Sequence, residues 1–314
     1  MAPHDPERTY TELLFASSRK YAAWDPELEV RVGDYGIITR GQRASFLKFW
    51  ARDRRQGVFL KQGNIYDNGK AKKFDVPPPK TYEHEGSTGV SWVVSQNASE
   101  TDLSADVSAQ TPALANCGVK ASFKFHSGQG AVLSMNGDSV TTIDPPGALR
   151  PLLDDADLPE GTVIVSEVHA TSSYARYLGT PEVRQVSIGL NVAPPAVANV
   201  AKADVSAQWL RSTTIGNFKS KVNADNERTY YPLFRLVALE GDAVSNGLRA
   251  GIDDEMEIPL PDAVPPWMTS GAERENEEQR SRDLVRYLPS RPRTLTMIGI
   301  GLIAGLLGAR LLSR

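Results

Sequence analysis

A basic segment interleaved with aromatic side chains is the part of this 314-residue chain with the most distinctive chemistry. Between Arg40 and Lys61, cations surround several large apolar side chains, and Asp53 is the only acid. Aromatic rings favour the headgroup region of a bilayer, and each nearby cation adds about 1 kcal/mol of attraction to an anionic surface. The segment therefore predicts binding to acidic lipid headgroups through Arg40, Arg43, Phe46, Lys48, Phe49, Trp50, Arg52, Arg54, Arg55 and Lys61.

Two other interpretations of this basic segment remain open. It could be a solvated hairpin loop whose aromatic residues cover the protein core, without any lipid contact. Nucleic acid is the weaker alternative, because the net charge of the chain is −3 and no nucleic-acid-binding motif accompanies the segment. We therefore expect membrane lipids, and not nucleic acid, as the partner of this segment.

The residue types that carry enzymatic or metal chemistry are scattered along the chain. None of the four histidines has a second metal ligand at the usual spacing: His4, His84, His126 and His169. The chain also lacks a G-x-S-x-G elbow, a P-loop and a dinucleotide-binding glycine motif. We therefore expect no enzymatic activity, no cofactor and no metal site.

The C-terminal residues 294–314 contain an apolar run without a charged side chain from Thr294 to Ala309. As a helix, residues 294–312 would be roughly 28 Å long, which is close to the ~30 Å hydrocarbon core of a bilayer. Apolar residues occur all round this helix and leave no polar face for water. We expect a transmembrane helix with apolar contacts from Leu295, Ile298, Ile300, Leu302, Ile303, Leu306 and Leu307. The alternative is an amphipathic helix docked on the core of the protein.

Cysteine usage and the flanks of this run indicate where the protein resides. The single cysteine, Cys117, allows no internal disulfide, and no apolar run opens the chain, so we expect a body that faces the cytosol. A short apolar tail with arginines on both sides favours a thin membrane. We expect anchoring in the mitochondrial outer membrane or the peroxisome, with the plasma membrane reached on activation.

Period-two alternation dominates the chain after residue 89 and predicts strands with one apolar face. Two blocks, 89–135 and 163–222, are separated by a break at 144–147 and a short helical turn at 148–153. Strands are predicted within them at 90–94, 103–110, 119–126, 163–168, 186–192 and 205–209, before the chain turns polar through 212–221.

Flanking elements complete the predicted body. A capping box at Thr9 and Glu12 predicts a helix over 9–24, and residues 30–38 predict a short bent strand. Residues 230–239 predict a closing strand that Pro232 places at a sheet edge or at the strand start.

These elements define the predicted fold class and domain division. The fold class is α+β, mainly antiparallel twisted β-sheet with a few short helices, plus the C-terminal transmembrane helix. We divide the chain into a body (1–240), a charged and proline-rich tether (241–293) and a membrane anchor (294–314).

The alternating strands are rich in Ser, Thr, Gly and Ala, which is poor material for a tight sandwich core. This composition is typical of strands that present one face to lipid and the other to water, at about ten residues per membrane crossing. The order of an N-terminal helix, two extendable hairpin regions, the strand VIVSEV (163–168) and the strand YPLFRLVAL (231–239) is similar to that of the gasdermin family. Within that family, the sequence pattern is most similar to that of the short fungal gasdermin-like cell-death proteins, and the resemblance covers residues 9–240.

The resemblance implies an effector of programmed cell death that binds acidic lipids, forms homo-oligomers and inserts both hairpin regions as a barrel pore. It also implies an activating protease that cuts in the 241–293 tether. The chain departs from the family in lacking a large C-terminal inhibitory domain and in ending with an apolar anchor. Two alternatives remain: a tail-anchored β-rich adaptor that binds lipid or a partner without forming a pore, and a membrane-bound enzyme.

Overall fold

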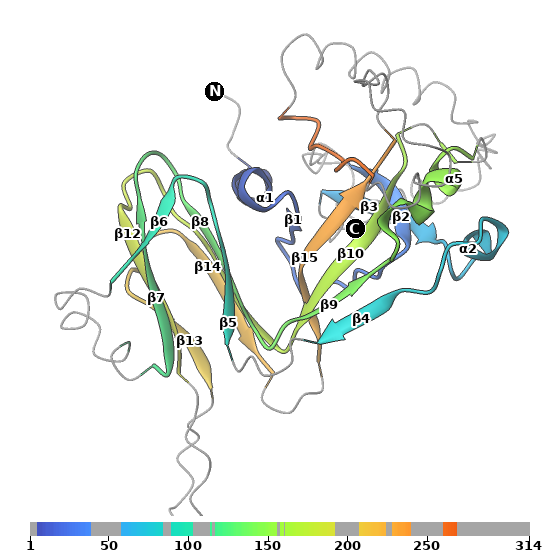
Figure 1. The fold of residues 1–314 in the computed structure, drawn as a ribbon. Coiled ribbons are helices and arrows are strands. Elements are labelled where there is room, and N and C mark those ends of the chain that lie inside the picture. Colours follow the sequence, from blue (N-terminus) through green and yellow to red (C-terminus); the bar gives the residue numbers. More distant parts are fainter. Residues whose placement is uncertain are drawn as a thin grey trace, which may run out of the picture. The chain divides into compact units, whose positions relative to one another are not determined.

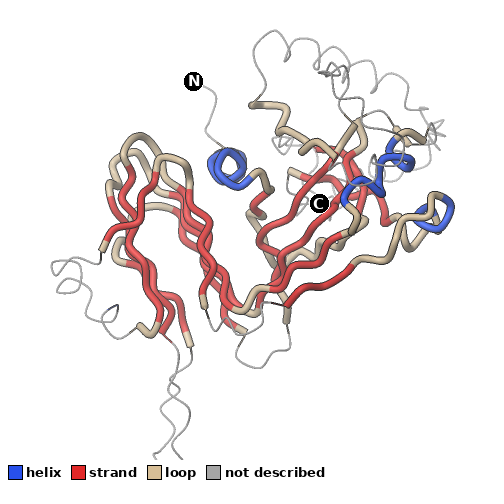
Figure 2. Tube along the Cα trace, viewed as in Figure 1, coloured by secondary structure: helices blue, strands red, loops and turns tan. Residues whose placement is uncertain are grey.

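The computed structural model describes residues 5–38, 58–83, 89–102, 114, 117–155, 158–159, 161–191, 207–223, 228–239 and 260–268. They form antiparallel β-sheets with a few short helices, as the sequence predicts (Figures 1 and 2). No helix among these residues is both long enough and apolar enough to cross a membrane. The predicted anchor at 294–314 and most of the basic segment lie outside the described residues.

The N-terminal helix α1 (Pro6–Ser18) starts earlier than predicted. Asp5 caps it by accepting a hydrogen bond from the Glu7 amide, and Pro6 occupies the first turn, where no amide donor is needed. The predicted capping box is therefore wrong, because Thr9 lies inside the helix and its hydroxyl donates to the Asp5 carbonyl. The helix ends at Arg19, whose φ of 59° is left-handed, and the chain continues as the short strand β1 (Tyr21–Ala22).

Sheet A contains seven strands in the order β1-β15-β10-β2-β3, with β9 pairing β10 and β4 pairing β9. The remaining strands are β2 (Asp34–Ile38), β3 (Phe59–Asn64), β4 (Lys80–Glu83), β9 (Ser139–Thr142), β10 (Val163–Thr171) and β15 (Tyr230–Val237). Among the described residues, three short helices accompany the sheet: α2 (Lys70–Lys73), the 3₁₀ helix Pro146–Leu149 and α5 (Arg150–Leu153). Helical residues such as Leu149 and Leu152 share a buried core with Val165 and Leu236 of the sheet.

Proline 232 lies inside β15, so the prediction of an edge strand or a strand start is wrong. Its strand pairs with β1 on one side and with β10 on the other. The β10–β15 register shifts between His169, which pairs with Leu233, and Thr171, which pairs with Tyr230. Pro232 therefore falls at a β-bulge, where its missing amide donor interrupts no regular ladder.

Two four-stranded sheets pack against each other as a sandwich. Sheet B has the order β14-β11-β8-β5 and consists of β5 (Val90–Val94), β8 (Ala131–Asn136), β11 (Ser173–Leu178) and β14 (Asn217–Val222). Sheet C has the order β13-β12-β7-β6 and consists of β6 (Ala98–Thr101), β7 (Val119–Phe125), β12 (Gln185–Asn191) and β13 (Gln208–Arg211). The predicted strand at 103–110 lies outside the described residues, and β14 was not predicted because its sequence is polar.

The sandwich core is better packed than the small-residue composition indicates. Trp92 of β5 lies with its ring centre 5.3 Å from that of Phe123 and 6.2 Å from that of Trp209, and Phe125 stacks on Tyr177 at 6.5 Å. A few aromatic side chains thus fill the space between strands of small residues, because each buries a large apolar area. The expectation that these strands make a poor sandwich core is wrong.

Residues 260–268 pack on the body, although the sequence assigns them to the tether. Leu260, Ala263 and Trp267 are buried in the core beside sheet A. Asp262 forms a β-bridge with Val237 and an ion pair with Arg235 at 2.6 Å. The first compact unit accordingly extends to Met268, beyond the predicted boundary at residue 240, because the apolar residues between the prolines find a place in the core. We call residues 260–268 the docked segment.

Candidate membrane-insertion region

Lys61 is the one predicted lipid-binding residue that the structure describes. It lies on β3, and its ammonium group is 2.8 Å from the buried Asp34 carboxylate. The same carboxylate accepts hydrogen bonds from the Asn64 side chain and the Arg31 amide, both at 2.8 Å. Lys61 therefore contributes to the packing of sheet A. The other predicted contacts, Arg40 to Arg55, and the predicted transmembrane residues are outside the described part of the chain.

The three sheets share one strand order, which the sequence does not reveal. Four stretches of chain, here called arms, each run through sheets A, B and C (Figure 1). Arm 1 is β4-β5-β6, arm 2 is β7-β8-β9, arm 3 is β10-β11-β12 and arm 4 is β13-β14-β15. In every sheet the arms lie in the order 1, 2, 3, 4. The arms therefore make one four-stranded ribbon, folded at a first bend between sheets A and B and a second bend between sheets B and C.

Arms 2 and 3 pair in a single register through both bends. Thr142 pairs with Glu167 in sheet A, Asn136 with Ser173 in sheet B, and Val119 with Leu190 in sheet C. Along the whole length, each step forward on arm 2 corresponds to one step backward on arm 3, as in a single antiparallel ladder. At the second bend the Gly179 amide donates to the Gly130 carbonyl and the Phe125 amide to the Arg184 carbonyl, both at 2.8 Å. We call this pairing of arms 2 and 3 the central seam. Between its paired stretches the two arms have equal numbers of unpaired residues, so the register does not change.

The outer seams of the ribbon are not continuous. Val94 pairs with Val132 in sheet B and Ala98 with Phe125 in sheet C, so arm 1 advances four residues while arm 2 spans seven. The seam between arms 3 and 4 also slips between sheets B and C. The outer arms therefore take a shorter route around the second bend, and the central seam alone keeps its register.

Glycines permit the close approaches at the bends. Gly137, at the first bend, has a φ of +63°, which other residues rarely adopt. At the second bend, a Cβ on Gly130 would lie 2.0 Å from the ring of Phe125. Both positions allow an arm to leave one sheet and enter the next without losing its neighbour.

A polar cluster joins sheet A to the first bend. The Nδ1 atom of His169 on β10 lies 3.4 Å from the Asp138 carboxylate, and its Nε2 atom lies 2.9 Å from Glu167. Lys20, which follows α1, is 2.7 Å from Nε2 and forms an ion pair with Glu167. The Ser91 hydroxyl of β5 donates to Asp138 at 2.7 Å. We call these five residues the bend cluster, since they connect α1, sheet A and sheet B.

The protonation of the bend cluster follows from these contacts. Burial opposes charge on His169, but its hydrogen bonds to Asp138 and Glu167 outweigh burial and raise its pKa. The hydrogen bond from His169 lowers the pKa of Asp138. Burial alone would raise the pKa of Glu167, whereas His169 and Lys20 together lower it to about 2. The cluster therefore favours charged carboxylates, and their hydrogen bonds raise the pKa of His169 although the charge of Lys20 opposes it.

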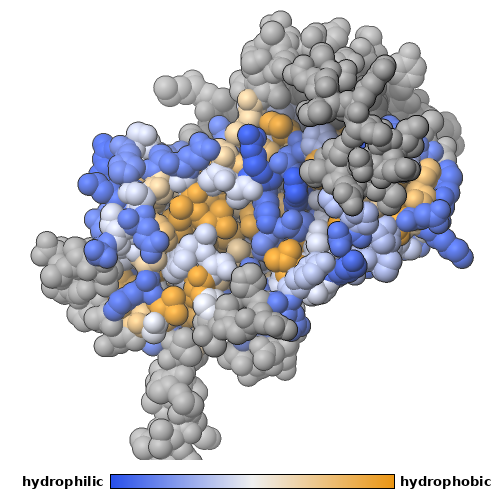
Figure 3. Space-filling view, in the orientation of Figure 1, coloured by the Kyte–Doolittle hydropathy of each residue, from blue (hydrophilic) through white to orange (hydrophobic). Residues whose placement is uncertain are grey.

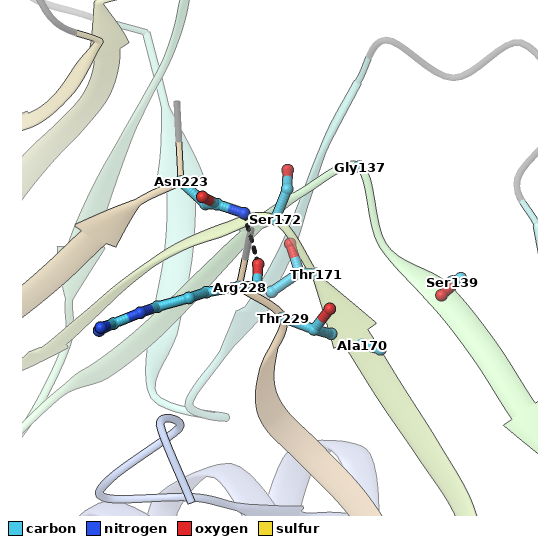
Figure 4. A pocket seen from close by; sticks show the side chains of 8 residues that line it. All are labelled: Gly137, Ser139, Ala170, Thr171, Ser172, Asn223, Arg228 and Thr229. Carbon is cyan, nitrogen blue, oxygen red and sulfur yellow. Dashed lines mark hydrogen bonds between the residues drawn. The ribbon is translucent and has the colours of Figure 1, made fainter. Parts of the chain in front are cut away.

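A pocket of about 210 Å³ lies at the first bend (Figure 4). Three arms change sheet around it, and its lining is polar: Gly137, Ser139, Ala170, Thr171, Ser172, Asn223, Arg228 and Thr229. The Asn223 amide donates to the Arg228 carbonyl at 2.6 Å, which links the ends of β14 and β15 across the pocket.

Helix α1 and the chain after it hold sheet B. Tyr10 and Leu14 pack on Leu133 and Met135 of β8 in a separate core. The guanidinium of Arg176 lies 3.5 Å from the Trp24 ring centre. Beyond the helix, Lys219 of β14 bridges Asp25 at 2.7 Å and Glu27 at 2.9 Å. The N-terminal region therefore fastens the outer face of sheet B.

The edge of arm 1 carries hydrophobic surface. Every residue of β5 is partly exposed, and Figure 3 shows hydrophobic side chains (orange) gathered where Figure 1 places this strand. An edge strand with apolar side chains and unpaired backbone groups is able to pair with a further strand.

Comparisons with protein families, with curated proteins and with solved structures give no match to this chain. The functional argument therefore depends on the geometry of the ribbon and its bends. Sequence reasoning located both alternating blocks, but it treated His169 as isolated and could not find the bend cluster. Its five members come from four separate places in the chain, with only Glu167 and His169 on the same strand, and no local pattern connects the four places.

Proposed function

We propose that the chain is a pore-forming effector that binds acidic membranes, oligomerises and inserts the hairpins formed by arms 1–2 and arms 3–4. The supporting observation is the central seam, whose register is the same in all three sheets. A sandwich that only had to be stable would need no common register across its bends. A ribbon that must straighten gains from one, because arms 2 and 3 can then leave the sandwich without exchanging partners.

The length of the ribbon supports this proposal. Residues 119–136 of arm 2 would extend over roughly 60 Å at about 3.3 Å per residue. A strand crosses a bilayer in about 9–11 residues, so the straightened arm exceeds one crossing. The membrane anchor at 294–314 and the basic segment at 40–61 would bring the body to the bilayer, in the class of protein that the gasdermin resemblance implies.

The docked segment gives the proposed activation a physical basis. The Tyr21 hydroxyl donates to the Ala263 carbonyl at 2.7 Å, and the Arg8 guanidinium lies 5.0 Å from the Trp267 ring centre. These contacts connect the docked segment to β1 and α1. A protease that cuts between residues 240 and 259 would leave the docked segment attached to the body by non-covalent contacts alone, and its departure would remove these contacts from α1 and β1.

A leakage experiment tests the proposal. A specific protease site is placed between residues 240 and 259 of the full chain, and dye release is measured from acidic and neutral vesicles before and after cutting. We expect release from acidic vesicles after cutting, with little release from neutral ones. Complete cutting without release or oligomers on acidic vesicles would contradict the pore.

The well-packed sandwich core supports a second candidate, the tail-anchored adaptor without pore activity. Its aromatic contacts stabilise the folded ribbon, and an adaptor needs only that stability. Binding to acidic vesicles without any dye release, before and after cutting, would favour this candidate.

A further inference from the structure

Strand β11 carries two large polar side chains on the face that α1 covers. Tyr174 and Arg176 alternate with the sandwich residues of β11 and share a face with Leu178, which packs in the core beneath α1. Tyr174 is fully buried, and Arg176 is only 4% exposed. Tyr10 of α1 is fully buried as well, and its ring centre lies 6.0 Å from the guanidinium carbon of Arg176. We call Tyr10, Tyr174 and Arg176 the Arg176 site.

Each side chain of the Arg176 site has a buried polar atom without a hydrogen-bond partner among the described residues. These atoms are the Tyr10 hydroxyl, the Tyr174 hydroxyl and Arg176 Nε. Buried polar atoms in folded proteins nearly always have a partner, because leaving a donor unpaired in the interior costs its full desolvation. Three unpaired atoms on neighbouring side chains therefore indicate a bound group that accepts hydrogen bonds.

Both phenols are neutral donors that lie close to the Arg176 charge. Burial raises the pKa of Tyr10 and Tyr174, that of Tyr174 to about 12, and the charge of Arg176 is among the groups that oppose the rise. The two hydroxyls therefore keep their protons at neutral pH. A group bound between them receives hydrogen bonds from two neutral donors and one cationic donor.

Arg176 forms no ion pair in the described part of the chain. Its Nη1 atom donates to the Asn217 side-chain oxygen at 3.0 Å, and its guanidinium lies 3.5 Å from the ring centre of Trp24. Neither the amide nor the indole carries a formal negative charge. Burial accordingly lowers the pKa of Arg176. A buried cation needs a counter-ion, because the water that would stabilise its charge has been removed.

The neighbouring charges do not supply this counter-ion by direct contact. Lys219 pairs with Arg176 across β11 and β14, so two cations lie opposite each other on one face, which is unfavourable. The carboxylates of Asp25 and Glu27 contact Lys219, at 2.7 and 2.9 Å. Glu7 also acts on Arg176 from a distance, but burial raises the pKa of its carboxyl group.

We propose that the Arg176 site binds one chloride ion, which accepts hydrogen bonds from the Tyr10 hydroxyl, the Tyr174 hydroxyl and Arg176 Nε. A monovalent ion matches the single charge of Arg176, whereas a phosphate or sulfate ion brings more negative charge and more acceptor oxygens than three donors satisfy. The ion connects α1 to sheet B, because one donor belongs to the helix and two belong to β11. This site does not depend on pore formation.

A buried water molecule is the competing occupant. It is able to meet the same three polar atoms, since buried waters typically make about three hydrogen bonds. It leaves the charge of Arg176 without a counter-ion, however. The two occupants are therefore distinguished by whether the protein responds to chloride.

A chloride titration of the full chain tests the site. Urea unfolding is followed in sodium chloride and in sodium gluconate at equal ionic strength, so that general screening is the same. We expect the urea midpoint to rise with chloride and to follow the dependence for one ion bound to the folded state. Equal midpoints in the two salts would overturn the inference.

Conservative variants assign the chloride response to the site. Tyr10→Phe and Tyr174→Phe each remove one hydroxyl and keep the ring, and each should raise the chloride dissociation constant by about tenfold, as expected for a hydrogen bond to a charged group. Tyr177→Phe is the matched control on the opposite face of β11, where its hydroxyl donates to the Ile215 carbonyl at 3.0 Å. This control should leave the dissociation constant unchanged. The same constant in all three variants would overturn the inference.

Bromide locates the ion directly. Crystals of the full chain grown in sodium bromide should give an anomalous difference peak in contact with the Tyr10 hydroxyl, the Tyr174 hydroxyl and Arg176 Nε. Ordered density at this place without an anomalous signal would identify a water molecule and overturn the inference. Neither readout involves dye release, so the failure of this site and the failure of the proposed pore are separate results.

Discussion

His169 Nδ1 lies 3.4 Å from the Asp138 carboxylate, which joins the middle of sheet A to the turn that leads into sheet B. His169 is on β10 of arm 3, and Asp138 lies between β8 and β9 of arm 2, at the place where the ribbon first bends. Lys20 and Glu167 extend the contact to the chain after α1. The bend cluster is therefore an ionic connection at the first bend between the chain after α1, sheet A and sheet B.

Replacing His169 with glutamine should weaken this connection. Hydrogen bonds to charged groups contribute about 1.5–3 kcal/mol, and we expect His169→Gln to lower the free energy of unfolding by a similar amount. Urea denaturation at pH 6 measures it. His126→Gln is the matched control, since His126 is exposed and its Nε2 atom contacts only the Ser99 hydroxyl among its described hydrogen bonds. Equal stability of the two variants would contradict the structural role of His169.

The bend cluster should make stability depend on pH in a defined window. The pKa of His169 is raised from its ordinary 6.5, so its contribution is complete below pH 6.5 and is lost as pH rises through the raised pKa. The pKa of Glu167 is lowered from 4.5 to about 2, so its contribution is complete above pH 4.5 and is lost as pH falls toward 2.

The contributions of His169 and Glu167 to the unfolding free energy are both complete between pH 4.5 and 6.5. The difference in unfolding free energy between the wild type and His169→Gln should therefore be largest there and should shrink toward alkaline pH. Denaturant titrations from pH 5 to 9 measure this difference, and a difference that grows with pH would refute the assignment.

Gly130 should not tolerate a side chain. A Cβ at this position would lie 2.0 Å from the Phe125 ring, which is itself buried, so Gly130→Ala forces the second bend to repack. Overpacking typically costs 1–3 kcal/mol, and we expect about that loss in a thermal or urea melt. Gly118→Ala is the control, because no atom lies within 4 Å of its Cβ position.

The docked segment should contribute to the stability of the body. Trp267 is 2% exposed, and Trp→Ala substitutions in cores cost about 3–5 kcal/mol. Val264→Ala, at a position that is 44% exposed, should change stability by less than about 0.5 kcal/mol. If the docked segment restrains the proposed pore, Trp267→Ala should also release dye from acidic vesicles without cutting. The absence of release would show that the docked segment stabilises the body without restraining the pore.

The basic segment carries its own test. Replacing Arg52, Arg54 and Arg55 with glutamate should weaken sedimentation with acidic vesicles, and the effect should be larger at low salt because exposed charges are screened within about 10 Å at 0.1 M. Unchanged sedimentation would instead support the interpretation of this segment as a solvated loop. Neutral vesicles provide the control for attraction that does not depend on charge.

Much of the local structure could be predicted from the sequence. The apolar run predicted as a strand at 90–94 has the same bounds as β5. The alternation predicted at 119–126 extends one residue beyond β7, because a strand with one apolar face has a period of two wherever it packs. The helix start was missed because Asp5 caps as well as Thr9 would. Strand β14 was missed because an edge strand with Lys219 and Lys221 shows no apolar face.

The sequence by itself determined the strands with regular alternation, such as β7 and β12, and where cations and aromatic residues gather, whereas β8 and β11 were not predicted from it. Only the tertiary structure decided that the four arms share one order, that arms 2 and 3 keep one register, and that His169 meets Lys20 and Asp138. The physical reason is that alternation depends on neighbours in the chain. Register and ionic clusters depend on pairing between residues far apart in sequence, and a shift of one residue would leave the local pattern unchanged while moving every side chain to the other face.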